Sequence, residues 1–370
     1  MAEARESLAI STMRHVPQLD GLRAVAIVIV FIGHLKLVSA FPAGFGVTIF
    51  FFLSGFLITT LLRIEQTNTG KISLRGFYWR RILRINPPLW ISMAFVAALC
   101  LSGLIDQPLD PFVVFGQAFF FVNYLPSMGQ GDGLPIPLWS LAVEEHFYLL
   151  FPLCFGLAMQ SMPARKLALW CAAACCAVLA IRLFNIYAIG EVERNYYWTH
   201  TRIDSILYGC ILALWNNPLV ERSAWKPRPW HVAGAMLLVL LTFAVRAPGF
   251  REGLRYSLQG MALFVLFSWT VQHKGWLSRI LLLQVVQRVG LYSYTLYLVH
   301  YGIILAVYKN LPGLPVIAQV ALAAALSMII GALMYRLVER PLGRWRRRLN
   351  RAEATDRAGE PIFTEETRAS

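Results

Sequence analysis

Long apolar stretches alternate with shorter polar segments along most of this chain. Residues 46–62 contain no charged side chain, and a run of about 17–25 apolar residues is long enough to cross the ~30 Å core of a bilayer. The pattern predicts an all-α, polytopic membrane helix bundle of about 10 transmembrane helices. The predicted spans lie near residues 22–40, 46–62, 88–105, 138–158, 167–187, 202–215, 230–246, 256–272, 287–307 and 315–337.

Composition agrees with a membrane protein. The chain of 370 residues is 57% hydrophobic and 15% charged, whereas a typical soluble domain is about 25% charged. A net charge of +14 would also suit a nucleic-acid-binding protein. Because basic residues collect in the loops on one side of membrane proteins, we expect the lipid bilayer, and no nucleic acid, as the partner.

The distribution of basic residues predicts which side each loop occupies. Lysine and arginine are frequent in 63–87 and then absent until Arg165, so alternating loops fit ten crossings with both termini cytoplasmic. Arg246, Arg251 and Arg255 fall on the outer side and depart from this rule. The apolar segment 111–125 is bracketed by Pro111 and Pro126 and would invert the topology if it crossed, so it is predicted to be re-entrant or interfacial.

One domain is predicted. Residues 1–18 are expected to form a cytoplasmic N-terminal segment, 19–345 the transmembrane domain and 346–370 a disordered cytoplasmic tail, since the last part is polar and lacks periodicity. The first apolar stretch has no signal-peptide cleavage pattern after it, so it is expected to stay in the membrane.

An arginine and a histidine stand out in the first apolar stretch. Arg23 and His34 are eleven residues apart, which places them on one helix face about 16 Å apart along the axis. Ionisable groups inside a membrane are functional-site candidates by default, and histidine accepts protons near neutral pH. The structural alternative is an interface anchor and a histidine that is hydrogen-bonded inside the bundle.

Two adjacent carboxylates lie inside a predicted span. Glu144 and Glu145 sit about one turn into the stretch 138–158, and Tyr148 follows Glu144 by one turn. Intramembrane carboxylates need partners or protonation, which favours a functional role. Trp139 is also typical of an interface aromatic residue.

Two further groups leave structural and functional interpretations open. Arg202 and Asp204 stand at the edge of a short span, where they could pair with each other. His300 follows Tyr294 and Tyr297 by one or two turns. A histidine among tyrosines is usually a satisfied core residue, and it gains interest if it faces His34.

A basic aromatic segment follows the second span. Residues 77–85 interleave aromatic rings with Arg80, Arg81 and Arg84. Such a segment suits an interfacial helix on anionic lipid, and arginine forks also suit phosphate groups. The sequence does not decide between these two interpretations.

Other chemistries are not indicated. The six cysteines form no C-x-x-C pair, so no metal site and no disulfide framework is predicted. The chain contains neither a G-x-S-x-G nucleophile elbow nor a P-loop or G-x-G-x-x-G motif.

Together the segments "QLDGLRAVAIVIVFIGH", "FGVTIFFFLSGFLITTLL", "FYWRRILRINP", "PLWSLAVEEHFYLLFP", "RIDSILYG", "LYSYTLYLVH" and "ERPLGRW" resemble the acyltransferase 3 family of integral-membrane O-acyltransferases. The resemblance extends over about residues 17–345 in the family's order. It implies transfer of an acyl group, by default acetyl, from acyl-CoA to a sugar hydroxyl in a surface polysaccharide, lipopolysaccharide, peptidoglycan or glycosylated small molecule. It also implies a multi-pass protein of the bacterial inner (cytoplasmic) membrane, with acyl-CoA as co-substrate rather than a tightly bound cofactor.

The resemblance also implies site residues. Arg23 and His34 match the family's R-x10-H pair, with the histidine as the catalytic group, and Arg81 and Arg84 match its R-x-x-R. With Arg80, the last two are expected to bind acyl-CoA. The W-S-L-x-x-E-x-x-x-Y motif falls on Trp139, Ser140, Leu141, Glu144 and Tyr148. Thr48 and His146 depart from the residues common in relatives.

These roles combine into a mechanistic hypothesis. His34 is expected to deprotonate the acceptor hydroxyl, or alternatively to be acylated transiently, and Glu144 is expected to orient its imidazole, as a carboxylate does in other catalytic histidine pairs. Arg202, Asp204, Tyr294 and His300 are expected to support the site. The alternatives are a proton-coupled transporter or flippase of a glycan or lipid, which equally needs intramembrane His and Glu, and a scaffold in which the charges only join helices.

Overall fold

The computed structural model describes residues 16–35, 37, 41–125 and 133–345. Every regular element in these ranges is a helix, so the predicted all-α class is confirmed for this part of the chain. Most of the predicted N-terminal segment 1–18 and all of the predicted tail 346–370 lie outside the described residues.

Within the described ranges, seven helices are long and apolar enough to cross a membrane. The seven are α2 (Pro17–His34), α3 (Ala43–Thr69), α4 (Leu74–Leu101), α6 (Trp139–Ser161), α7 (Ala164–Phe184), α14 (Gln284–Asn310) and α15 (Val316–Met334). The fifth and the last of them, α7 and α15, continue into the π-helical turns η2 (Asn185–Ile189) and η4 (Tyr335–Glu339), respectively.

Three predicted spans fall on helices that do not meet these criteria. They are α9 (Asp204–Trp215), α10 (Pro229–Ala244) and α12 (Arg255–Gln272). α9 has 12 residues and is therefore about 18 Å long, which is too short to cross the bilayer alone. A multi-pass helical bundle is supported, whereas the count of about 10 spans and the cytoplasmic position of both termini stay predictions.

The apolar segment that was predicted not to cross the membrane is broken into two short pieces. α5 (Pro111–Ala118) begins where Asp110 accepts a hydrogen bond from the Phe112 amide at 2.7 Å, and η1 (Val122–Tyr124) follows it. α5 is about 12 Å long, so it does not span. The other short helices are η3 (Glu193–Tyr196), α8 (Thr199–Arg202), α11 (Pro248–Glu252) and α13 (Trp276–Leu281).

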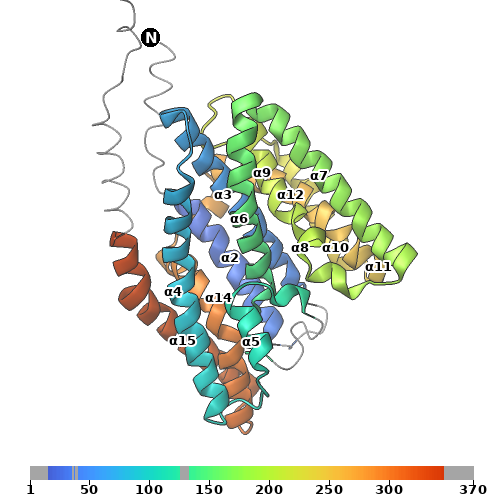
Figure 1. The fold of residues 1–370 in the computed structure, drawn as a ribbon. Helices are drawn as coiled ribbons and strands as arrows, with labels where there is room; N and C mark the ends of the chain where they lie inside the picture. Colours follow the sequence, from blue (N-terminus) through green and yellow to red (C-terminus); the bar gives the residue numbers. More distant parts are fainter. Residues whose placement is uncertain (1–15, 36, 38–40, 126–132, 346–370) are drawn as a thin grey trace, which may run out of the picture.

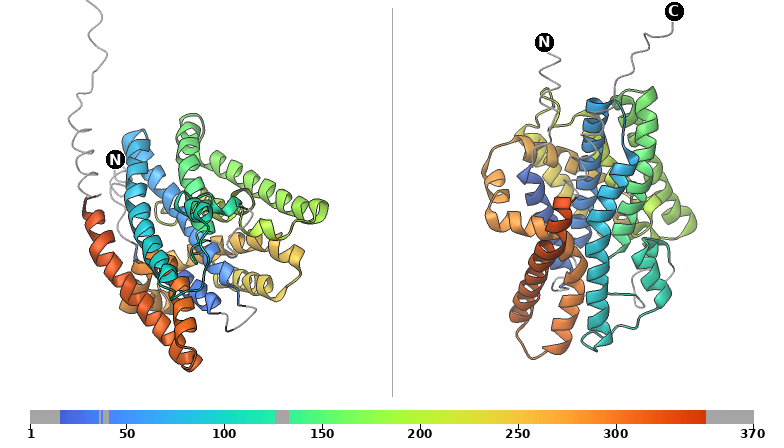
Figure 2. Two further views of the ribbon diagram at one scale, coloured as in Figure 1. Left: turned by 60° about the horizontal axis from the view of Figure 1, so that its bottom comes forward. Right: turned by 60° about the vertical axis from the view of Figure 1, so that its left-hand side comes forward.

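Two groups of helices flank a central pair. α2 and α3 occupy the middle of the bundle, with α4, α14 and α15 on one side and α7, α9, α10 and α12 on the other (Figure 1). α14 and α15 pack side by side as a helical hairpin (Figure 2). α14 also packs along α2 and α4, so it connects the first helix of the structure with its last.

Glycines allow the central helices to approach closely. A Cβ at Gly55 or Gly209 would lie 2.0 or 2.1 Å from a backbone oxygen of the facing helix, across the contact of α3 with α9. A Cβ at Gly290 would lie 2.0 Å from the Asp20 oxygen, across the contact of α14 with α2. Small residues at such crossings are how helices pack closely in membranes, and here they fix α2, α3, α9 and α14 against one another.

Helix boundaries differ from the predicted spans at two places that affect the site. α2 ends at His34, so this histidine lies at an end of its helix rather than in the middle of the predicted span 22–40. α3 continues to Thr69, where Gly70 ends it with a positive φ of 69°, and α4 begins at Leu74. Much of the predicted basic loop 63–87 is therefore helical, which holds its arginines on rigid elements.

Candidate active site

A cavity of about 450 Å³ lies among α2, α3, α4, α6, α14 and η4 with the residues that follow it. Its volume is typical of small-molecule sites. Along α3 it extends from Val47 to Ile58, a distance of about 16 Å at the rise of an α-helix. Its wall includes both charged groups and apolar side chains such as Phe50, Leu53 and Leu57.

Arginines from three elements converge on this cavity. Arg23 of α2, Arg81 and Arg84 of α4, and Arg340 after η4 all line it. The guanidinium of Arg23 donates to Asp20 at 2.7 Å. Thus Arg23, Arg81 and Arg84, which the sequence placed in two separate motifs, share one site.

The third predicted acyl-CoA ligand lies elsewhere. Arg80 donates to the Glu65 carboxylate at 3.3 Å, and it is not among the described residues that line the cavity. Arg81 and Arg84 are three residues apart and share the helix face that lines the cavity, whereas the Arg80 side chain is held by Glu65 of α3.

The carboxylate and hydroxyl groups predicted from the fourth span form one wall. Tyr148 donates to the Glu144 carboxylate at 3.0 Å, and the guanidinium of Arg81 lies 5.1 Å from the centre of the Tyr148 ring. Tyr294 of α14 also lines the cavity and donates to the Ile85 carbonyl at 2.7 Å. The structure therefore brings Glu144, Tyr148 and Tyr294 together with the arginines.

Two hydroxyl groups of the cavity wall, on α6 and α14, lie in contact with each other. The Ser140 and Tyr297 oxygens are 2.5 Å apart, and Tyr297 also donates to the Pro137 carbonyl at 2.9 Å. Both side chains are buried and both line the cavity. This contact joins α6 to α14 at the cavity wall, and the Phe50 ring lies 6.1 Å from the Tyr297 ring.

A pair of histidines lies next to Tyr297. Nδ1 of His34 is 3.2 Å from Nε2 of His300, and the rings are 4.9 Å apart. The His300 ring is 6.0 Å from that of Tyr297, and His300 is fully buried. The condition that made His300 interesting in the sequence, that it faces His34, is met.

The predicted orienting role of Glu144 toward His34 stays a prediction. Glu144 lies on the cavity wall with Tyr148, and the neighbours of the His34 imidazole include the rings of His300 and Tyr301.

Arg202 has surroundings that differ from those expected. Its guanidinium is fully buried and lies 3.7 Å from the centre of the Tyr256 ring and 5.5 Å from that of Trp139. It donates to the Tyr196 carbonyl at 3.2 Å and to the Thr48 hydroxyl at 3.4 Å. Aromatic faces attract such a cation, so Arg202 and Trp139 form an aromatic–cation cluster outside the cavity wall.

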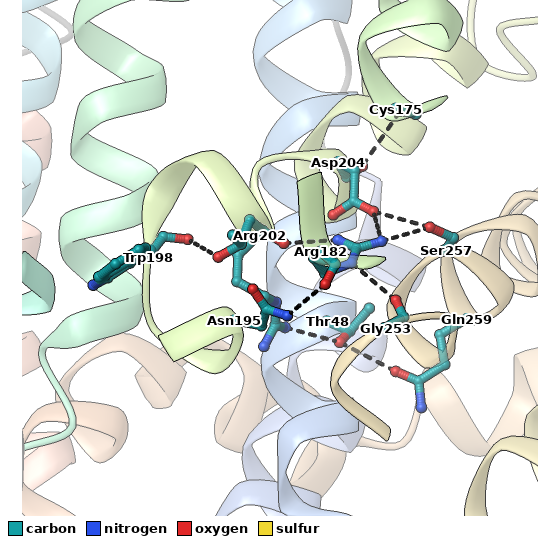
Figure 3. Close-up of polar contacts among 11 residues, drawn as sticks. Thr48, Cys175, Arg182, Asn195, Trp198, Arg202, Asp204, Gly253, Ser257 and Gln259 are labelled. Atoms are coloured by element: carbon teal, nitrogen blue, oxygen red, sulfur yellow. Dashed lines mark hydrogen bonds and ion pairs between the residues drawn. The ribbon is translucent and has the colours of Figure 1, made fainter. Parts of the chain in front are cut away.

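The sequence left open whether Arg202 pairs with Asp204, and the structure shows Asp204 paired with another arginine. Asp204 accepts from Arg182 of α7 at 2.7 Å, with both side chains fully buried, and Figure 3 shows these groups beside Ser257. Arg202 points toward Thr48 instead. α7 packs along α9, which brings an arginine 22 residues away in sequence closer than the one two residues away.

The sequence interpretation missed several groups. Tyr297 was noted only as a neighbour of His300, yet it lines the cavity and contacts Ser140. Glu339 and Arg340 also line the cavity, where the η4 π-turn ends. The segment "ERPLGRW" contains both residues, and π-turns are frequent at functional sites, but no sequence spacing predicts such a turn.

Fold and site define a multi-pass helical membrane protein with an arginine-lined cavity that ends near a histidine pair. The sequence model of the acyltransferase domain family matches residues 16–336. The chain therefore belongs to the acyltransferase 3 family, as its motifs predicted.

Two curated relatives illustrate the similarity. The chain is 30% identical over 352 residues to the peptidoglycan O-acetyltransferase OatA of Listeria monocytogenes, and 29% identical over 351 residues to the O-acetyltransferase OatA of Staphylococcus aureus. Each alignment covers 89% of this chain but 56% and 57% of the relative, respectively, so the chain spans little more than half of their length. No solved structure matches this chain.

Proposed function

We propose that this chain is an acyl-CoA-dependent membrane O-acyltransferase that transfers an acetyl group to a sugar hydroxyl of a cell-surface glycan. The observation that carries this proposal is the cavity, which collects Arg23, Arg81 and Arg84 and ends one side chain away from a histidine pair. Family membership and the names of the O-acetyltransferase relatives support the same reaction.

The cavity suits an acyl-CoA donor because its polar and apolar walls match the two parts of that molecule. Arginine forks bind phosphate groups through paired, charge-assisted hydrogen bonds, so Arg81 and Arg84 would hold the CoA phosphates. The apolar wall at Phe50 and Leu53 would take the pantetheine arm. The thioester then comes to lie near Ser140 and Tyr297.

The acceptor hydroxyl would approach from the side of His34. His34 takes the proton of that hydroxyl, and the oxygen attacks the thioester carbonyl carbon. The new C–O bond replaces the C–S bond, and CoA leaves as the thiolate, which takes up a proton. General-base catalysis of this kind contributes typically 10²–10⁴-fold to the rate.

The test uses membranes that contain the intact protein or a variant at matched abundance. We would supply labelled acetyl-CoA with a glycan extract, and follow free CoA and label in alkali-labile ester. His34→Ala is expected to abolish ester formation. Arg81→Ala is expected to raise the KM for acetyl-CoA at least tenfold and to leave kcat largely unchanged, because it removes a phosphate contact rather than the base.

Arg75→Ala is the matched control for the arginine variant. Arg75 is an exposed residue of the same helix α4 and is not among the described cavity-lining residues, so its loss removes the same charge but leaves the cavity intact. An equal rise in KM from Arg75→Ala would show a general effect of surface charge and would contradict donor binding at Arg81. Absence of CoA release from the intact protein would favour the transporter alternative.

A further inference from the structure

His300 offers a hydrogen-bonding pattern that fixes where its ring proton lies. Its Nδ1 is 2.9 Å from the Leu296 carbonyl oxygen and 2.9 Å from the Tyr297 carbonyl oxygen. Carbonyl oxygens only accept hydrogen bonds, so Nδ1 of His300 carries the proton. In the neutral ring, the lone pair then lies on Nε2, and that atom faces His34.

The acceptors around Nδ1 of His34 indicate the position of its ring proton in the same way. Its Nδ1 is 2.9 Å from the Val30 carbonyl oxygen and 3.2 Å from Nε2 of His300. Both of these atoms are acceptors, so Nδ1 of His34 is the donor, and in the neutral ring the lone pair lies on Nε2. A protonated His300 would turn an N–H toward the N–H of His34, and therefore this arrangement requires a neutral His300.

We propose that His300 is the positioning residue of the active site, and that it holds His34 in the tautomer with its lone pair on Nε2. This inference deepens the proposed function and rests on it for the catalytic consequence. A carboxylate has the corresponding task beside other catalytic histidines. Here a buried, neutral imidazole that is anchored to two carbonyls of α14 takes that place.

The arrangement also supports the charged form of His34 during transfer. When Nε2 of His34 takes the proton of the acceptor hydroxyl, its Nδ1–H becomes a donor on a cation, and hydrogen bonds from charged donors are about twice as strong as neutral ones. Nε2 of His300 accepts this strengthened bond and keeps its own proton on Nδ1. The proton later passes from His34 to the leaving thiolate, which restores the starting state.

The first experiment measures the tautomer directly and needs no substrate. Nitrogen-15 NMR of membranes that contain the full chain, labelled at histidine, distinguishes a protonated ring nitrogen from one with a lone pair. A spectrum of His34→Gln assigns the His34 signals by difference. We expect a protonated Nδ1 and an unprotonated Nε2 on His34 in the intact protein, and a mixture of tautomers in His300→Phe.

The second experiment asks whether the bond affects catalysis. His300→Phe is expected to lower kcat for acetyl transfer at least tenfold and to change the KM for acetyl-CoA less than twofold, because the donor cavity lies on the other side of Tyr297. His300→Gln places an amide oxygen where it can accept from His34, and is expected to recover at least half of the lost activity on a logarithmic scale. His273→Phe removes a histidine that stacks on Trp269 and serves as the control.

Each outcome decides one of the two claims. An unprotonated Nδ1 on His34 in the intact protein overturns the inference, whatever the activity. The inference is also overturned if His300→Gln is as inactive as His300→Phe and both variants elute as folded protein in size-exclusion chromatography. If NMR shows the predicted tautomer but the intact protein releases no CoA, the proposed function is overturned. The hydrogen bond between the two histidines would then hold without a catalytic role.

Discussion

Replacing Asp204 by asparagine tests whether the buried charges beside α9 stabilise the fold or belong to the site. Asp204 and Arg182 are both fully buried and 2.7 Å apart. Arg182 also donates to the carbonyls of Thr201 and Gly253 and to the Ser257 hydroxyl. Asp204→Asn keeps the shape but leaves the cation without its carboxylate, and breaking a buried pair in this way costs about 3–5 kcal/mol.

The assay is thermal unfolding in detergent micelles, followed by tryptophan fluorescence. At roughly 2 °C per kcal/mol for a chain of this size, Asp204→Asn is expected to lower the midpoint by about 6–10 °C. Glu191→Gln is the matched control, because it changes a carboxylate to an amide in a pair with Arg194 that is largely exposed. Exposed pairs contribute less than about 1 kcal/mol, so its midpoint is expected to stay within about 2 °C.

Equal midpoints for the two variants would refute the reasoning, since burial is what distinguishes them. A second measurement on the same variants, the KM for acetyl-CoA, is independent of stability. Asp204 is not among the described residues that line the cavity, so the KM for acetyl-CoA at a temperature where both variants are folded is expected to match that of the intact protein. A tenfold higher KM for acetyl-CoA in Asp204→Asn would show that Asp204 does contribute to donor binding.

Two other predictions follow from the cavity and the helix contacts. Tyr297→Ala is expected to raise the ratio of kcat/KM for hexanoyl-CoA to kcat/KM for acetyl-CoA by about fourfold for each additional methylene that the site accepts. Tyr297→Phe keeps the ring and is expected to keep the ratio. Equal ratios in both variants would show that Tyr297 does not limit the length of the acyl chain. Gly209→Ala places a Cβ 2.1 Å from the Phe52 oxygen, so overpacking is expected to destabilise the protein by about 1–3 kcal/mol. Gly234→Ala, with nothing within 4 Å, is expected to be neutral or stabilising in the same unfolding assay, and equal losses would contradict the packing argument.

Contacts within one helix were predictable from the sequence. Glu144 and Tyr148 are four residues apart, and their bond of 3.0 Å follows directly from helical spacing. The same spacing places Arg23 and His34 on one face, and both do lie along α14, since Arg23 shares the cavity with Tyr294 and His34 bonds to His300. Apolar periodicity was enough for these features because a helix fixes its own geometry.

Contacts between helices were not predictable in the same way. The nearest opposite charge in sequence to Asp204 is Arg202, yet Arg182 of α7 reaches it, because the crossing of α7 with α9 decides the partner. Helix ends are a second limit. The apolar run that contains His34 continues beyond it in sequence, so hydropathy places the histidine inside a span, whereas the backbone ends α2 there.

α2 and α14 together explain why the proposed donor cavity and the proposed base lie at different levels of the bundle. Arg23 and His34 are about 16 Å apart along α2, and α14 packs along the same helix, so a polar group at each level of α2 meets a different level of α14. Tyr297 lies between these levels and is tied to Ser140. The proposed donor cavity and the His34–His300 pair thus share α2 and α14 at different levels, and Tyr297 lines the cavity with its ring 6.0 Å from that of His300.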